Sequence, residues 1–154
     1  MKKVLSLATL VLLSISLAFV ACSKDDDDSP VPKTKTELIA QSTWKFDKAT
    51  AGLYGDISAY IDACYKDNIF TFQSNGNGNV NEATVICSPT TAGNFTWSFQ
   101  SNETVLNVSA SLLPTGSNNF NIVTLNETNL VLSQNVTLPA PINQTVLVEF
   151  TLKH

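Results

Sequence analysis

Apolar and polar residues alternate along most of the chain beyond residue 42, and asparagine, glycine and serine interrupt the alternation at short intervals. A period of two is typical of a β-strand with one buried face. Short polar interruptions are typical of turns between antiparallel neighbours. The pattern predicts eight strands, at Thr43–Thr50, Asn68–Ser74, Asn79–Cys87, Asn94–Gln100, Glu103–Ala110, Asn118–Leu125, Asn129–Val136 and Gln144–Lys153.

These strands are joined mostly by short connections, and no long helix separates them. Parallel neighbours would need long crossover segments, so antiparallel pairing is expected throughout. Closing eight such strands on themselves removes both exposed sheet edges. We therefore predict an all-β fold, an eight-stranded antiparallel up-and-down barrel over residues 36–154.

Two short helices are expected beside the barrel. Thr34 is followed by Glu37 three residues later, a capping-box pattern that predicts a helix over residues 34–41. The one long connection, residues 51–67, is expected to contain one or two helical turns that cover a mouth of the barrel. Its apolar residues recur at helical spacing, at Ile57, Tyr60, Ile61 and Cys64.

The turns predict how some strands are paired. A two-residue turn at Ser101 and Asn102 sets Trp97 opposite Leu106 and Phe95 opposite Val108, so that the apolar faces coincide. For the two strands that flank Asn126, the pattern does not select one register.

Cys64 and Cys87 are predicted to form a disulfide. A turn at residues 75–78 places Cys87 opposite Lys66, two residues from Cys64, at the same end of one hairpin. In the loop-entropy description such a bond contributes about 3 kcal/mol to stability. Two unpaired buried thiols are the alternative at this stage.

The N-terminal 21 residues have the pattern of a secretory signal peptide. Two lysines precede an apolar run over residues 4–20, and the small residue Ala21 ends the segment. A membrane anchor of similar length is the alternative. The run Leu17-Ala-Phe-Val-Ala-Cys22 resembles a bacterial lipoprotein lipobox. This resemblance implies that Cys22 becomes the mature N-terminus and carries acyl chains, through which the protein is anchored to a membrane.

Four consecutive aspartates, Asp25–Asp28, follow this cysteine. Such a charge run is typical of a solvated tether, here residues 22–35, and adjacent carboxylates on an extended chain are not organised for metal binding. Ser23-Lys-Asp-Asp26 also resembles the acidic signal behind the lipidated cysteine of Bacteroidota lipoproteins. That resemblance implies a location on the outer membrane, facing the cell exterior.

Composition argues against several functions. The chain has no arginine and a net charge of −4, whereas nucleic-acid binding needs clustered cations. The single histidine, His154, ends the chain, so a Ser–His or Cys–His nucleophile pair inside the domain is not expected. Asp56, Asp62 and Asp67 could form a carboxylate pair, but loop solvation is the simpler interpretation. We expect no enzyme activity, no metal and no cofactor.

Several segments in order resemble the lipocalin-like domains of Bacteroidota lipoproteins over about residues 36–152. They are Gln41-Ser-Thr-Trp-Lys-Phe46, Cys64-Tyr-Lys-Asp-Asn-Ile-Phe-Thr-Phe72, Asn94-Phe-Thr-Trp97, Phe120-Asn-Ile-Val-Thr-Leu125 and Leu130-Val-Leu132. The resemblance implies an eight-stranded barrel around a central cavity, with the first loop over its open mouth. It implies that a small apolar ligand binds in that cavity.

Twelve apolar residues are candidates to line this cavity. An eight-stranded barrel is also narrow enough to be filled by its own side chains, in which case the protein would act as an accessory module for a surface protein partner. The candidates are Trp44, Phe46, Phe70, Phe72, Trp97, Phe99, Leu106, Val108, Phe120, Ile122, Val148 and Phe150.

Overall fold

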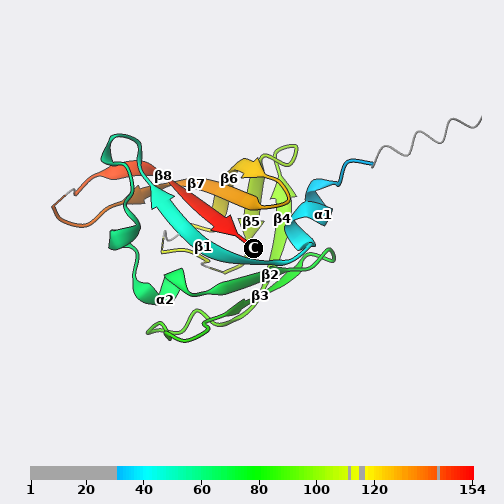
Figure 1. Cartoon of the computed structure of the whole chain (residues 1–154), viewed down its shortest axis with the longest axis horizontal. Coiled ribbons are helices and arrows are strands. Elements are labelled where there is room, and N and C mark those ends of the chain that lie inside the picture. The colour runs from blue at the N-terminus through cyan, green and yellow to red at the C-terminus, as the bar shows by residue number, and fades with distance from the viewer. Residues whose placement is uncertain (1–30, 111, 115–116, 142) are drawn as a thin grey trace, which may run out of the picture. The chain divides into compact units, whose positions relative to one another are not determined.

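The computed structural model describes residues 31–110, 112–114, 117–141 and 143–154. The predicted signal peptide, Cys22 and the aspartate run lie outside the described residues. Within the compact unit Pro32–His154, eight antiparallel strands form one closed barrel in sequence order (Figure 1). The strands are β1 Thr43–Thr50, β2 Ile69–Phe72, β3 Asn77–Asn81, β4 Gly93–Gln100, β5 Val105–Val108, β6 Asn119–Leu125, β7 Asn129–Thr137 and β8 Thr145–Lys153. The predicted fold class is confirmed.

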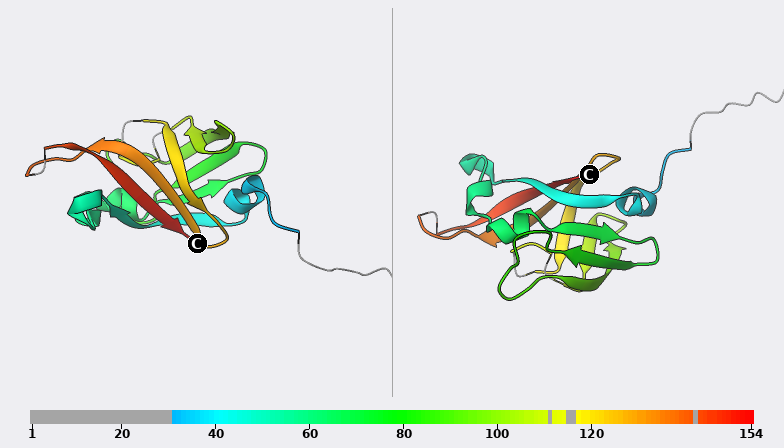
Figure 2. Two further views of the ribbon diagram at one scale, coloured as in Figure 1. Left: turned by 90° about the horizontal axis from the view of Figure 1, so that it is seen from above. Right: turned by 60° about the horizontal axis from the view of Figure 1, so that its bottom comes forward.

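The barrel has two different ends because the strands run alternately up and down (Figure 2). The turn end carries three short turns, at residues 73–76, 101–104 and 126–128. The loop end carries the four longer connections, at residues 51–68, 82–92, 109–118 and 138–144.

A short helix, α1 (Lys35–Ala40), packs at the turn end. The predicted capping box is present: Glu37 N donates to Thr34 Oγ1 at 3.2 Å, and Thr34 N donates to Glu37 Oε2 at 2.7 Å. Lys35 Nζ and Gln41 Nε2 donate to the carbonyls of Glu103 and Glu127 in two of the turns. These bonds fix the helix against the barrel end.

Trp44 closes the turn end from inside. Its side chain is fully buried, and its Nε1 donates to the carbonyl of Ile39 in α1 at 2.8 Å. The His154 ring lies 3.9 Å from the Trp44 ring, and His154 Nδ1 is 2.8 Å from the carbonyl of Thr43. These contacts join the start of β1 to His154, and the buried Trp44 side chain closes the barrel interior at the turn end.

The β2–β3 hairpin corrects one prediction. Phe70 pairs with Val80 and Phe72 with Gly78, so the register differs by three residues from a turn at residues 75–78. The tighter turn has Gly76 at φ +83°, and Asn75 Oδ1 accepts a hydrogen bond from Asn77 N. This register sets the two phenylalanines opposite inward-facing positions. Strand β3 also ends at Asn81, well before the predicted Cys87.

The β4–β5 turn has four residues, Ser101–Thr104, and not two. Its first three residues adopt positive φ angles of 51°, 54° and 59°. Trp97 therefore pairs with Val108 and Phe99 with Leu106. The predicted register is wrong by two residues, but a shift of two leaves every side chain on its predicted face.

The register around Asn126, which the sequence left open, is set by a side chain. Asn126 Oδ1 accepts hydrogen bonds from Thr128 N and Asn129 N, at 3.0 and 2.8 Å. This turn pairs Leu125 with Leu130, and a bulge follows between Ile122 and Thr124.

Candidate functional site

The twelve candidate lumen residues converge inside the barrel. Eight of them retain no more than 1% of their surface exposed, and Trp97 retains 7%. Phe46, Phe99 and Ile122 are partly buried and pack against the same core. A side chain beside a void large enough for water would keep accessible surface, so the eight buried side chains border no such void. Their contact with a ligand stays a prediction, since in the structure they contact one another.

Aromatic rings fill the side of the barrel below β2 to β4. The Phe72 ring makes edge-to-face contacts with Phe95 and Trp97, at centroid distances of 5.3 and 5.7 Å. Trp97 contacts Phe99 in the same way at 5.3 Å, and Trp97 Nε1 donates to the carbonyls of Gln73 and Asn77. Such contacts stabilise a fixed packing of rings in preference to an adaptable cavity.

The first connection folds over the loop end in three short helical pieces: η1 (Gly52–Tyr54), η2 (Ser58–Tyr60) and α2 (Ala63–Lys66). Ile57 and Ile61 are buried in the same core as the lumen residues, whereas Tyr60, also expected on the apolar face, is 43% exposed. Ile57 N donates to the carbonyl of Ala49 at 2.9 Å. The connection thus completes the core at this mouth.

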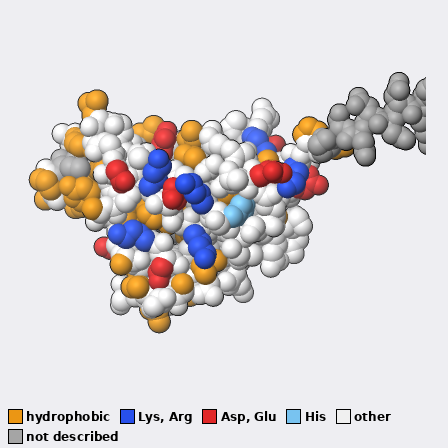
Figure 3. All heavy atoms as spheres, in the orientation of Figure 1, with side chains coloured by type: hydrophobic (Ala, Val, Ile, Leu, Met, Phe, Trp, Pro, Cys, Tyr) orange, Lys and Arg blue, Asp and Glu red, His pale blue; other side chains and the backbone are white. Residues whose placement is uncertain are grey.

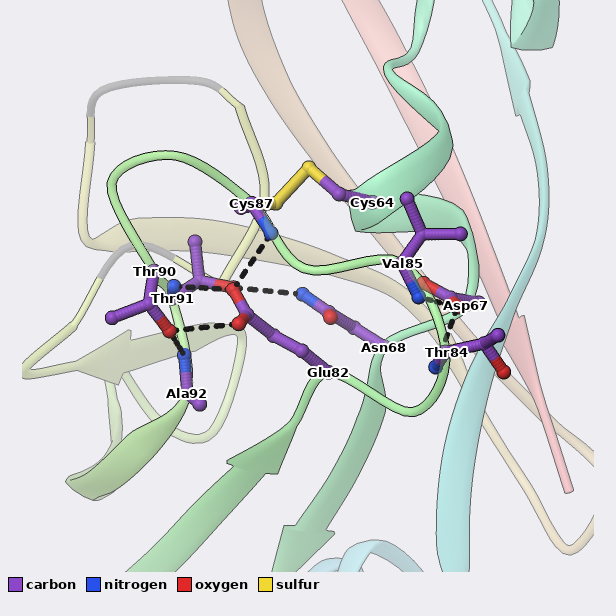
Figure 4. Close-up of a disulfide and its surroundings, with 10 residues drawn as sticks. All are labelled: Cys64, Asp67, Asn68, Glu82, Thr84, Val85, Cys87, Thr90, Thr91 and Ala92. Carbon is purple, nitrogen blue, oxygen red and sulfur yellow. Dashed lines mark hydrogen bonds between the residues drawn. A yellow bond between two sulfur atoms is a disulfide. The ribbon is translucent and has the colours of Figure 1, made fainter.

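A disulfide joins Cys64 in α2 to Cys87 in the 82–92 connection, as predicted (Figure 4). The two Cα atoms lie 5.1 Å apart. Because β3 ends at Asn81, Cys87 reaches Cys64 from a loop and not from an extended strand. The bond holds two connections of the loop end together.

Glu82 organises the rest of that connection. Its carboxylate accepts hydrogen bonds from the backbone N–H groups of Thr91 and Cys87 and from the hydroxyls of Thr90 and Thr91 (Figure 4). Led by the Thr91 N–H, these donors lower the pKa of Glu82 from 4.5 to about 2. A largely buried carboxylate thus replaces strand pairing as the organiser of residues 82–92.

Asp67 and Asn68, which immediately precede β2, form hydrogen bonds to the 82–92 connection. Asp67 Oδ2 accepts hydrogen bonds from Thr84 N and Val85 N, at 3.0 and 2.8 Å. Asn68 is fully buried and donates to Thr91 Oγ1.

Asp56, in the first connection, accepts a hydrogen bond at Oδ1 from Ser58 N. In the part of the chain that the structure describes, no three His, Cys, Asp or Glu side chains group as a metal site would require.

An open apolar pocket lies at the rim of the loop end, between η1 and the start of β8. Its volume is about 320 Å³. Tyr54 Oη donates to Gln144 Oε1 at 3.0 Å across it. We call it the rim pocket; it is lined by Ala51, Gly52, Leu53, Tyr54, Gln144, Val146 and Leu147.

The rim pocket and Glu82 were both missed from the sequence. Glu82 has one signal that could have found it: it is the single charged residue between Asp67 and Glu103. Leu53 and Leu147 carried no comparable signal. An exposed leucine in a loop and an outward leucine in a strand become one surface only when β8 returns beside β1.

Replacing both Cys64 and Cys87 by alanine is expected to lower the free energy of unfolding by about 3 kcal/mol, because the unfolded chain regains the entropy of the open loop. Urea unfolding of a chain carrying Cys22→Ser, with and without the two replacements, measures the difference. Reduction of the parent chain should move its midpoint to that of the variant. Equal midpoints in all three samples would contradict a stabilising disulfide.

The stability of the domain is expected to fall between pH 4.5 and about 2. Because the pKa of Glu82 is lowered from 4.5 to about 2 on folding, the unfolded chain takes up the proton first as the pH decreases. The contribution of Glu82 is therefore complete above pH 4.5 and lost as the pH approaches 2. As the pH decreases through this range, the urea unfolding midpoint should fall less steeply for Glu82→Gln than for the parent chain. Glu103→Gln, in an exposed turn, should keep the slope of the parent; an unchanged slope in Glu82→Gln would refute the assignment.

Comparisons with known proteins agree with this architecture. The family of the lipocalin-like domain matches residues 41–132. This match covers most of the barrel, from the start of β1 into β7. A comparison with curated proteins gives no significant match. Barrels of this size can hold one small ligand, as lipocalins do. With eight antiparallel strands closed in sequence order and this match, the chain belongs to the family of lipocalin-like domains.

Proposed function

We propose that the protein is a lipid-anchored lipoprotein on the outer face of the outer membrane, and that its lipocalin-like barrel binds a small apolar ligand in the rim pocket. One observation carries the ligand site: the rim pocket is open and apolar, while the interior of the barrel is occupied by its own side chains.

The rim pocket has the size and chemistry of a modest ligand site. Its volume of about 320 Å³ lies at the lower end of the range for small-molecule pockets, roughly 300–1,000 Å³. Leu53 is fully exposed and Leu147 is 52% exposed. A ligand that covered both would remove apolar area from water, worth about 25 cal/mol for each Å². The Tyr54–Gln144 hydrogen bond offers polar atoms that could orient it.

The anchoring part of the proposal is supported by the lipobox-like Leu17–Cys22 and by Asp25–Asp28 behind it. Among the described residues, no helix is long and apolar enough to cross a membrane. Acyl chains on Cys22 would attach the barrel through residues 23–33, which lead to α1 at the turn end.

A second candidate function is an interaction module that binds a surface protein partner. It is favoured by exposed apolar side chains at the loop end that lie outside the rim pocket. These are Tyr60, Val85 and Ile86, which are 43%, 43% and 73% exposed. Figure 3 shows hydrophobic side chains gathered at this end, with Lys, Asp and Glu side chains over the middle of the same face and near α1.

Leu53→Ser with Leu147→Ser is expected to weaken binding of N-phenyl-1-naphthylamine, a neutral apolar fluorophore, by about tenfold or more. The two changes remove the exposed apolar lining without touching the core. Fluorescence titration of the full chain carrying Cys22→Ser measures the affinity. Val123→Ser, equally exposed on β6 outside the pocket, is the matched control. If the parent chain does not bind the probe, the small-ligand proposal falls. If Val85→Ser with Ile86→Ser removes binding instead, the site is misplaced.

Replacing Asp25–Asp28 by asparagine is expected to leave the protein lipidated but facing the periplasm, because the acidic surface signal is lost. Cys22→Ser should leave it unanchored. Protease treatment of intact cells, followed by detection of the barrel, measures surface exposure, and labelling with a radioactive fatty acid measures lipidation. Equal cleavage of the Asp-to-Asn variant and the parent would show that these aspartates carry no surface signal.

A further inference from the structure

A second open cavity, of about 470 Å³, lies on the outer wall of the barrel and is separate from the rim pocket. We call it the amide groove. It crosses the start of β3, the middle of β4 and the residue after β5. Its lining consists of Gln73, Asn77, Gly78, Asn94, Phe95, Thr96 and Ser109.

Strand register explains why these polar side chains meet. Asn77 pairs with Thr96, and Ser109 N donates to the carbonyl of Thr96, so the three residues form one row across neighbouring strands. All three are exposed. The next pair, Gly78 and Phe95, faces inward. A Cβ on Gly78 would lie 2.3 Å from the Phe95 ring and 2.8 Å from the carbonyl of Thr71, so the Phe95 ring packs directly on the Gly78 backbone from inside the barrel.

Much of the hydrogen-bonding capacity of the amide groove is not used by any of the residues that the structure describes. The side chains of Gln73, Asn77 and Thr96 form no hydrogen bond with any described residue. Asn94 Oδ1 accepts from Asn79 Nδ2, which leaves the Asn94 amide hydrogens available. Ser109 Oγ accepts from Thr96 N and can still donate its hydroxyl hydrogen. The groove therefore presents both donors and acceptors at short intervals.

The strands that form the amide groove carry no charged side chain. None of the six strands from β2 to β7 contains Lys, Arg, Asp or Glu. The charged residues of the barrel strands all lie on β1 and β8, such as Lys45 and Glu149. An ionic ligand would have to leave water for a site without an opposite charge, which is unfavourable. A protein partner would find no exposed aromatic or arginine anchor in the groove.

We propose that the amide groove binds a neutral oligosaccharide. Vicinal hydroxyl groups both donate and accept hydrogen bonds, and they match carboxamide and hydroxyl side chains that do the same. A neutral sugar loses no ionic hydration when it binds. A sugar hydroxyl that pairs with Gln73, Asn77 or Thr96 also satisfies a side chain that has no hydrogen-bond partner among the described residues. This ligand class and this surface are both independent of the rim pocket.

The test uses the full chain carrying Cys22→Ser, labelled with ¹⁵N, and four hexasaccharide probes. Maltohexaose, cellohexaose and mannohexaose are neutral, and hexagalacturonate is the anionic comparison. We expect at least one neutral probe to bind with a Kd below about 1 mM and to shift the amide resonances of Asn77, Asn94, Thr96 and Ser109. Absence of shifts with all three neutral probes, or equal binding of hexagalacturonate, would overturn the proposal.

Asn77→Ala with Thr96→Ala should weaken binding of the neutral probe by about tenfold or more. Asn77→Asp, which keeps the side-chain shape but removes its donors, should weaken it as well. The matched control is Asn121→Ala with Ser98→Ala, an amide and a hydroxyl exposed on the same wall outside the groove. Unchanged affinity in both groove variants would overturn the assignment. Binding of N-phenyl-1-naphthylamine should be the same in all of them, which separates this site from the rim pocket.

Discussion

The pairing of β1 with β8 is the constraint on which the rest of the structure depends. It closes the barrel through Phe46 opposite Leu152 and Ala49 opposite Phe150, with an irregularity between Phe46 and Lys48. Closure leaves no sheet edge unpaired and fixes how much space remains inside. Trp44 and the first connection then seal the two ends.

The interior of the barrel is filled by its own side chains. Because the inward residues pack on one another, the cavities described here lie at the rim and on the outer wall. Both depend on the closed sheet for their shape. The rim pocket needs β8 beside the first connection, and the amide groove needs three neighbouring strands in register.

The loop end is held by polar and covalent contacts where strand pairing stops. After Asn81 the chain leaves the sheet, and its backbone N–H groups donate hydrogen bonds to the carboxylates of Glu82 and Asp67. A buried carboxylate is costly unless it is well paired, and four donors meet that requirement for Glu82. The disulfide adds a tie to the first connection. The two connections are thereby held together over the loop end.

The sequence by itself determined the strand count, the short capped helix and the inward face of each long strand. Those features depend on local alternation and on side chains a few residues apart, such as Thr34 and Glu37. Turn lengths and registers were not determined by the local pattern, because the turns at Ser101–Thr104 and at Asn75 are fixed together with the pairing of the strand faces that they join. Tertiary structure alone decided that the lumen is packed, since this depends on the summed volume of side chains from all eight strands. It alone brought Asn77, Thr96 and Ser109 into one row, because residues far apart in sequence become neighbours only through the register of the closed sheet.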